Sequence, residues 1–335
     1  MPSDIPEKPR PGAPPMMDAD RVLEIREQAR AIITNEDLRT PDVARESGIP
    51  YGTLSSWLTG SYPGRADNVA ARVQRWIESR EVRKQIAATA PEAPRFVKTP
   101  TAEAVQELLR HAQHMPDLAT FLGAPGIGKT SAACHYTATT SNVWKITADP
   151  TLTKTRAVLI DICRVLKIYA GGMPSQLQRR ICDKVRGTGG LLIIDEAQHL
   201  LPETLDLVRS IHDQADIGIA LLGNERVQSR LEGDGRKEQF AQLTSRVGMR
   251  RRRGKAQARD IDALLDAWDV TEAEPRLLLR VIASRPGALR LMTKTLKMAH
   301  MLAAPEGVPP SAMHIRTAFS KVSTEALPAG IEEAA

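Results

Sequence analysis

A glycine-rich segment of the chain has the residue types and spacing of a phosphate-binding loop. The pattern GxxxxGK[ST] is matched in full by Gly123-Ala124-Pro125-Gly126-Ile127-Gly128-Lys129-Thr130. The glycines let backbone N–H groups close around a phosphate, and a helix that begins here adds a favourable dipole. We expect Lys129 to reach the β- and γ-phosphates of ATP, Thr130 to place its hydroxyl on Mg²⁺, and Ser131 to adjoin them in the first helical turn. A chance glycine-rich turn is the alternative, but an apolar run and a helical segment flank the loop.

Two carboxylates follow a second apolar run. Leu191–Ile194 leads directly into Asp195 and Glu196. A carboxylate at the end of a buried strand is costly unless it meets a cation or hydrogen-bond donors. We expect Asp195 to hold Mg²⁺ through water and Glu196 to orient or deprotonate the attacking water. With the phosphate loop upstream, these residues predict ATP hydrolysis rather than a strand end that meets solvent.

Three further polar residues are candidates for the same site. Asn224 follows the apolar run Ile217–Leu222, where it could sit beside the γ-phosphate or simply cap the next helix. Arg246 precedes the last apolar run and could reach a neighbouring subunit's nucleotide, because arginine stabilises transferring phosphoryl groups. Arg290 opens a helix after Pro286-Gly287 and could sense the γ-phosphate from a lid. A surface arginine and a structural salt bridge are the respective alternatives.

The elements that must position these residues alternate between apolar strands and helices. This pattern predicts an α/β fold, a P-loop NTPase core with a parallel sheet and helices on both faces. The expected strands are Leu118–Leu122, Val143–Thr147, Leu191–Ile194, Ile217–Leu222 and Val247–Arg251, with helices starting near Lys129, Lys154, Ser175 and Glu203. The expected parts are a disordered tail (1–17), an all-α helix-turn-helix domain (18–80), a linker (81–95), the ATPase core (96–258), an all-α helical lid (259–325) and a tail (326–335).

The segment from Thr40 to Leu58 has the spacing of a helix-turn-helix, with Gly48 in the turn. Its second helix would enter a major groove of DNA, and side chains there and nearby would contact bases and backbone. The candidates are Thr53, Ser55 and Ser56 for bases or phosphates, and Arg45, Arg65 and Arg72 for the backbone. Residues 1–80 hold 11 basic and 12 acidic side chains, so we expect weak, poorly sequence-specific contact; a helical bundle for protein contacts is the alternative.

Basic residues elsewhere suggest a second surface for double-stranded DNA. The chain has a formal net charge of +6 and a pI near 9.3, a mild preference for polyanionic partners. The run Arg250–Lys255 includes Arg251, and it is either a phosphate-binding segment or a solvated loop. The remaining candidates for a DNA-facing surface are Lys154, Arg156, Arg179 and Arg180.

The composition excludes several classes of protein. The three cysteines are far apart and form no CxxC pair, which argues against a disulfide framework or a zinc site and favours a reducing compartment. No apolar stretch approaches the roughly 20 residues that span a bilayer. The N-terminus also lacks the apolar segment of a signal peptide. We therefore expect a cytoplasmic protein with no membrane partner.

The order of these motifs resembles that of the AAA+ ATPases over about residues 96–300. With further motifs, residues 21–325 resemble the transposition B proteins of Mu-type phages. The segments that carry this likeness are the helix-turn-helix, PRFV at 94–97, the phosphate loop, NVWKIT at 142–147, GLLIIDEAQHL at 190–200 and RPGALR at 285–290. The first 17 residues and the segment 325–335 depart from the pattern.

The resemblance implies an ATPase that forms ATP-dependent filaments or rings on DNA in a bacterial host's cytoplasm. Such proteins select target DNA and stimulate strand transfer by a partner transposase, which in turn stimulates ATP hydrolysis. A helicase-loader or initiator-type AAA+ switch has the same core and remains an alternative. A helix-turn-helix regulator with ATP only as a ligand is the third reading, which intact Glu196 and Arg246 disfavour.

Overall fold

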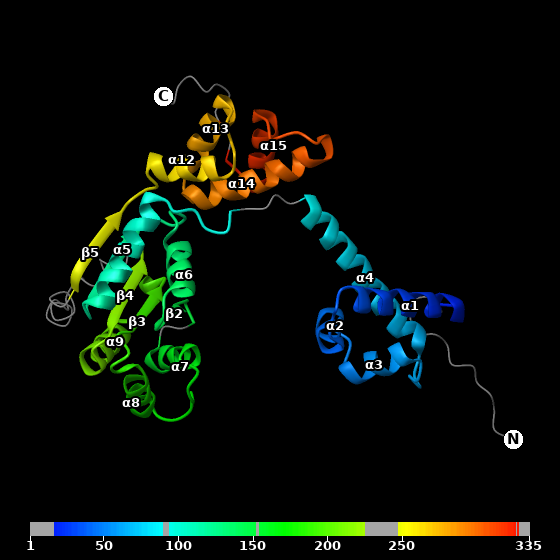
Figure 1. The fold of residues 1–335 in the computed structure, drawn as a ribbon, viewed down its shortest axis with the longest axis horizontal. Coiled ribbons are helices and arrows are strands. Elements are labelled where there is room, and N and C mark those ends of the chain that lie inside the picture. Colours follow the sequence, from blue (N-terminus) through cyan, green and yellow to red (C-terminus); the bar gives the residue numbers. More distant parts are fainter. Residues whose placement is uncertain (1–16, 90–93, 152–153, 225–246, 326, 328–335) are drawn as a thin grey trace. The chain divides into compact units, whose positions relative to one another are not determined.

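The computed structural model describes residues 17–89, 94–151, 154–224, 247–325 and 327. The chain divides into two compact units, Met1–Ala90 and Pro91–Ala335 (Figure 1). Within the described residues, no helix is both long and apolar enough to cross a membrane.

The first unit is helical. Its elements are α1 (Ala19–Asn35), α2 (Thr40–Ser47), α3 (Tyr51–Thr59) and α4 (Ala66–Thr89). They enclose a core in which Trp57 and Ile25 are fully buried and Trp76 is nearly so. Gly48 ends α2 with a φ of 66°, a left-handed conformation that glycine adopts without strain. The structure has two helices joined by this turn, but the helix-turn-helix assignment and DNA binding by this unit stay predictions.

The linker expected at residues 81–95 begins later than the sequence suggested. Helix α4 continues to Thr89, so residues 81–89 are helical. The physical reason is that residues 81–88 are mostly good helix formers, and the first proline that could end the helix is Pro91.

The second unit contains a five-stranded parallel sheet in the order β2-β3-β4-β1-β5. The strands are β1 (Leu118–Gly123), β2 (Val143–Thr147), β3 (Leu191–Asp195), β4 (Gly218–Gly223) and β5 (Val247–Arg253). Every residue of β1, β3 and β4 is buried, as expected for parallel strands covered on both faces. The expected fold class is confirmed, and the expected strand positions agree to within about two residues.

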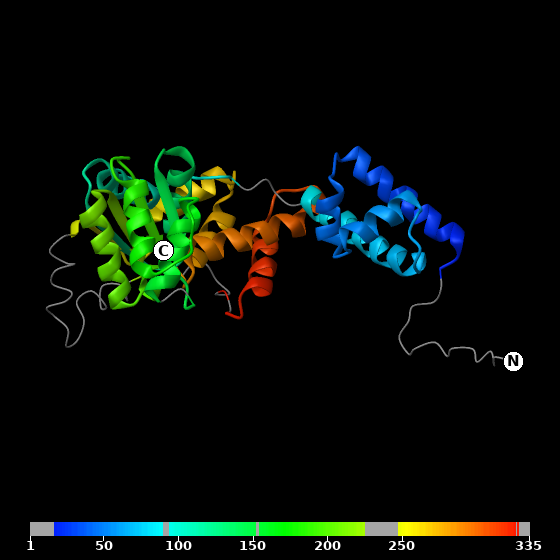
Figure 2. The same ribbon diagram turned by 90° about the horizontal axis from the view of Figure 1, so that it is seen from below.

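Helices cover both faces of this sheet (Figure 1; Figure 2). One core includes α5 (Pro100–His114) and α6 (Lys129–Thr139); the other includes α7 (Thr155–Val165), α8 (Pro174–Val185) and α9 (Pro202–Ala215). Both α8 and α9 begin with proline, one residue before the expected starts, because proline suits the first helical position. Helix α5 was not among the expected elements.

The C-terminal helices pack around a separate core of the same unit. They are α12 (Ala258–Ala267), α13 (Ala273–Ala283), α14 (Ala288–Ala303) and α15 (Ala312–Val322). Leu265, Leu279, Met292 and Ile315, one from each helix, are fully buried there. We refer to these helices as the lid.

A buried carboxylate joins the lid to the sheet domain. Asp260, in the first turn of α12, is fully buried. Its Oδ1 accepts a hydrogen bond from the Thr101 N–H at 2.7 Å, and its Oδ2 accepts from Thr101 Oγ1 at 2.6 Å and from the Gln257 N–H at 2.9 Å. Thr101 lies in the first turn of α5, so the carboxylate sits at two helix N-termini, where negative charge is favoured.

Replacing Asp260 with alanine is expected to destabilise the second unit by about 3 kcal/mol, because buried hydrogen bonds to a charged group are lost. Urea-induced unfolding would measure the change. Asp262→Ala is the matched control: Asp262 lies on the same helix but pairs at the surface with Arg276 and Arg280. The control should lose less than about 1 kcal/mol. Equal losses in the two variants would contradict a special role for Asp260.

Candidate nucleotide-binding site

The phosphate loop connects β1 to α6 at the carboxyl edge of the sheet. Gly126 and Gly128 have φ values of 84° and 99°, a region that other residues rarely adopt. A Cβ at Gly126 would lie 2.0 Å from the carbonyl oxygen of Gly287, at the start of α14. The loop therefore touches the lid directly, and only glycine allows this approach.

Lys129 is buried at the first position of α6, with 8% of its surface exposed. Its Nζ donates hydrogen bonds to the carbonyl oxygens of Gly123 at 2.7 Å and Ala124 at 2.8 Å. Burial lowers the pKa of this ammonium group, although the carboxylates of Glu196 and Asp195 oppose the shift. The lysine is thus held inside the loop, where an anionic ligand would favour its charged form.

Asp195 is suited to a hard cation. The residue ends β3 and is 1% exposed. Its Oδ1 accepts from the Glu196 N–H at 3.0 Å, whereas no described residue donates a hydrogen bond to its buried Oδ2. Lys145 on β2 lies beside that oxygen, with its Nζ at 3.6 Å. A buried carboxylate oxygen without a donor fits Mg²⁺, which prefers oxygen ligands, and the Thr130 hydroxyl offers another.

Glu196 and Asn224 are linked through a residue that the sequence reasoning missed. Gln198 is buried at 7% exposure, and its Nε2 donates to Glu196 Oε2. Its Oε1 accepts from the backbone N–H of Asn224 at 3.3 Å. The structure therefore brings the end of β4 to the catalytic candidate through this side chain. The sequence signal for Gln198 was its position two residues after Glu196 in the segment GLLIIDEAQHL.

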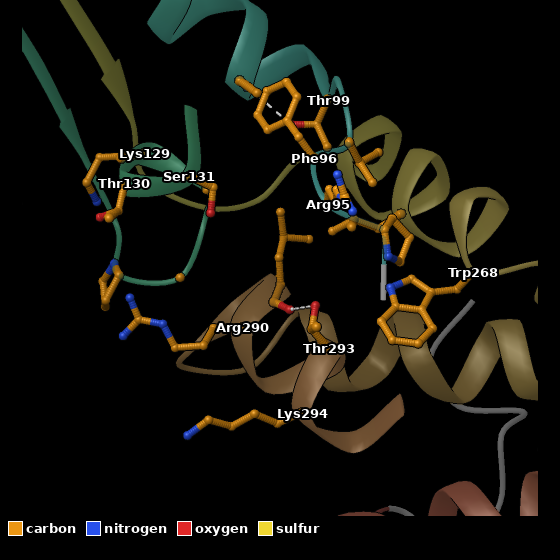
Figure 3. Close-up of a pocket in the computed structure, with 18 of the residues that line it drawn as sticks. Arg95, Phe96, Thr99, Lys129, Thr130, Ser131, Trp268, Arg290, Thr293 and Lys294 are labelled. Carbon is orange, nitrogen blue, oxygen red and sulfur yellow. Dashed lines mark hydrogen bonds between the residues drawn. The ribbon is translucent and has the colours of Figure 1, made fainter. Parts of the chain in front are cut away.

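A cavity of about 390 Å³ lies between the phosphate loop and the lid (Figure 3). Lys129, Thr130 and Arg290 lie at one end of it, and Trp268 lies at the other. The other lining residues are Pro94, Arg95, Phe96, Val97, Thr99, Ala102, Pro125, Gly126, Gly128, Ser131, Glu196, Leu264, Leu289, Thr293, Lys294 and Lys297. A cationic end with backbone donors and an aromatic end together suit a nucleoside triphosphate.

Several predicted residues converge on this cavity, and others do not. Thr130, Ser131, Glu196 and Arg290 line it. Arg246 lies outside the described residues. Sequence reasoning did not identify Trp268 or the lysines that follow Arg290 on α14, because no motif marks them. The sequence signal for the two lysines was their spacing from Arg290, which places Arg290, Lys294 and Lys297 on one helix face.

The basic residues proposed for DNA contact fall in different places. Arg156 donates to the Gly172 carbonyl oxygen at 3.5 Å, and Arg180 donates to that of Gly171 at 2.6 Å, so both meet at the α7–α8 loop. Lys154 and Arg179 are exposed near the same helices. Arg251 instead lies on β5, beside Glu107 of α5 at 3.5 Å.

On α3, the three predicted polar residues are half-buried. The Ser56 hydroxyl donates to the carbonyl oxygen of Gly52 at 2.8 Å, within its own helix. For Thr53 and Ser55, the described residues show no contact that favours DNA over another ligand. DNA contact by all three residues therefore stays a prediction.

Comparison with known proteins decides the family. Residues 245–322 match the family described as Mu B transposition protein, C terminal, and residues 112–231 match an AAA domain. The chain is 35% identical over 305 residues to the ATP-dependent target DNA activator B of Escherichia phage Mu, covering 91% of this chain and 96% of that protein. The chain belongs to the Mu B transposition protein family.

Two further members of the family show the same relationship. The ATP-dependent target DNA activator B of Escherichia phage D108 is 34% identical, with the same coverage. The Mu-like prophage FluMu DNA transposition protein B of Haemophilus influenzae is 34% identical over 266 residues, covering 78% of this chain and 92% of that protein. The resemblance inferred from the motifs is confirmed.

Proposed function

We propose that this chain is an ATPase that assembles on double-stranded DNA when ATP is bound, selects target DNA, and activates a partner transposase. The observation that carries the proposal is the cavity between the phosphate loop and the lid, in a family whose relatives are named for ATP-dependent activation of target DNA. Family membership favours this function over a helicase loader or a helix-turn-helix regulator.

The proposed hydrolysis uses groups that already lie together. Backbone N–H groups of the loop, Lys129 and Arg290 would bind the phosphates, and Glu196 would accept the proton of the attacking water. Mg²⁺, held by Thr130 and Asp195, would supply charge neutralisation on the β- and γ-oxygens. Gln198 holds one oxygen of Glu196, and we assign it the role of orienting that carboxylate.

The proposed dependence of assembly on ATP rests on the lid. Gly126 of the loop touches Gly287 of the lid, and Arg290 and Lys294 follow on the same helix. A nucleotide held between the two would fix the lid relative to the sheet domain. Subunits that contact one another through the lid would then assemble in a single orientation. In that orientation, Arg246 of one copy would contact the nucleotide of the next.

The test is duplex binding by the full chain with ATP, with ADP and without nucleotide, using random-sequence DNA and sedimentation. ATP hydrolysis is measured in parallel, with and without DNA and with and without a transposase of a Mu-like element. Sedimentation of the chain with DNA only in ATP, together with hydrolysis that transposase increases, supports the proposal. Tight binding to one specific sequence without ATP would overturn it.

A further inference from the structure

The first unit contains a basic hollow. No residue of α3, the helix expected to enter the DNA groove, lines it. The hollow has a volume of about 340 Å³ and is formed by the end of α2 and one face of α4. It is lined by Glu46, Ser47, Arg72, Arg75, Trp76, Ser79 and Arg83. Residues 72, 75, 79 and 83 follow the spacing of a single helix face.

The acidic residue in this arginine hollow is already neutralised. Glu46 accepts a hydrogen bond from Trp76 Nε1 at 3.0 Å and pairs with Arg80 at 2.8 Å. Arg80 also pairs with Glu36 at 2.5 Å, and these contacts raise its pKa, with the Glu36 hydrogen bond as the largest cause. Lys84 also pairs with Glu36, so the two carboxylates beside the hollow are balanced by two cations, Arg80 and Lys84, neither of which lines it.

The three lining arginines keep their charge available. Among the described residues, none of Arg72, Arg75 and Arg83 forms an ion pair with a carboxylate. Each instead donates to a backbone carbonyl oxygen: Arg72 to Gly48 in the turn, Arg75 to Ala71 at 3.3 Å, and Arg83 to Ser79 at 3.3 Å. These bonds hold the guanidinium groups and leave further N–H donors for a ligand.

The helix-turn-helix face expected to bind DNA lacks this charge. Helix α3 contains no charged residue. Arg65 pairs with Asp67 at 2.6 Å, and Arg45 lies 3.3 Å from Asp42, a carboxylate that it shares with Arg39. Both candidates for backbone contact therefore have an acidic partner close by. Of the three arginines predicted from the sequence, only Arg72 lies in the hollow.

We propose that the arginine hollow on α4 is where the first unit holds the phosphate backbone of duplex DNA. Arginine forks bind phosphate oxygens in pairs, and the hydroxyls of Ser47 and Ser79 add the donor type that phosphate contacts use. Arg72 and Arg83 are 11 positions apart on the helix, a span of about 16 Å. Duplex DNA has one charge per roughly 1.7 Å of its axis, so a span of this length can face several phosphates. This inference rests on the proposed function, because it assumes that duplex DNA is the partner.

Contact of this kind is independent of base sequence. It neutralises phosphates and releases counterions, so affinity falls as salt rises. The hollow thus supplies the weak, non-selective attraction that the near-neutral charge of the first unit as a whole does not. An acidic segment of a partner protein is the competing ligand. The salt dependence of duplex affinity distinguishes DNA from such a segment.

The test uses the full chain with ATP and a short random-sequence duplex, followed by fluorescence anisotropy over a salt series. The double variant Arg75→Gln/Arg83→Gln removes two charges and leaves Arg72 on the Gly48 turn. We expect the magnitude of the slope of log K against log salt to fall by about 1.8, because each of the two lost phosphate contacts contributes roughly 0.9. Arg75→Lys/Arg83→Lys should keep most of the slope, because the charges remain.

The matched control is Arg21→Gln/Arg39→Gln, which makes the same change in net charge in the same unit. Arg21 pairs with Glu24, and Arg39 shares Asp42 with Arg45. Neither residue lines the hollow, so the control should leave the slope unchanged. Thermal unfolding of each variant confirms that the fold persists. An unchanged slope in the arginine-hollow variant overturns the inference. If that variant also loses the stimulation of ATP hydrolysis by transposase, the hollow binds a protein instead. Absence of ATP-dependent duplex binding in the unsubstituted chain would instead overturn the proposed function and this inference with it.

Discussion

Replacing Lys129 with alanine is expected to abolish ATP binding, and with it the ATP-dependent assembly on DNA. The ammonium group would make charge-assisted hydrogen bonds to phosphate oxygens, each contributing about 1.5–3 kcal/mol, so two such bonds correspond to a loss of roughly a hundredfold or more in affinity. The variant also leaves the carbonyl oxygens of Gly123 and Ala124 without their donor. Titration with a fluorescent ATP analogue measures the binding directly, and sedimentation with duplex DNA measures the assembly.

Lys184→Ala is the control for this prediction. Lys184 lies exposed on α8, away from the residues that line the cavity, so its loss changes the net charge equally without touching the site. Lys129→Arg adds a second comparison, because it keeps the charge but is too long and planar for the buried position. Assemblies that persisted unchanged in Lys129→Ala would show that the nucleotide site does not drive them.

The sheet and the phosphate loop could be predicted because their signals are local. Short apolar runs alternating with helices specify a parallel sheet, and polar residues at the carboxyl ends of its strands must gather at one edge. Asp195 and Glu196 were predicted in this way, and Lys129 was predicted from the GxxxxGK[ST] motif. The loop glycines also have a local cause, since a backbone that approaches a phosphate needs conformations that only glycine adopts freely.

The rest of the site depends on contacts between distant parts of the chain. Asp260 and Thr101 are 159 positions apart, and nothing beside either residue indicates its partner. Trp268 reaches the cavity only because α12 packs over α5. The length of α4 was underestimated because alanine and proline near residue 90 suggested a linker, although alanine favours helix. In each case tertiary packing decided what composition left open.

The same distinction explains why the first unit was the harder part to interpret. The helix-turn-helix spacing drew attention to Thr53, Ser55 and Ser56, which carry no charge. The ion pairs of Arg45 and Arg65, and the hollow that brings Arg72 together with two other arginines, appear only once the helices are packed. A count of charges along the sequence cannot separate paired from unpaired arginines.

Glu196→Gln is expected to lower the rate of ATP hydrolysis by about 10²–10⁴-fold, the usual contribution of a general base, while leaving ATP binding intact. Glutamine has nearly the same shape but cannot accept the proton of the attacking water. Its amide oxygen can still accept the hydrogen bond from Gln198, so the local packing should survive. ATP-bound assemblies on duplex DNA should then persist after dilution, which time-resolved anisotropy and single-turnover hydrolysis would measure.

Gln198→Ala separates positioning from chemistry in this prediction. It removes the donor to Glu196 Oε2 and the acceptor for the Asn224 N–H but keeps the carboxylate. Misplacing a catalytic group is less costly than losing it, so we expect a fall in kcat of roughly tenfold, with KM little changed. Because Gln198 acts through Glu196, adding Gln198→Ala to Glu196→Gln should lower hydrolysis little further. Rapid disassembly of Glu196→Gln at the unsubstituted rate would instead show that another group deprotonates the water, and that the Glu196–Gln198 contact has only a structural role.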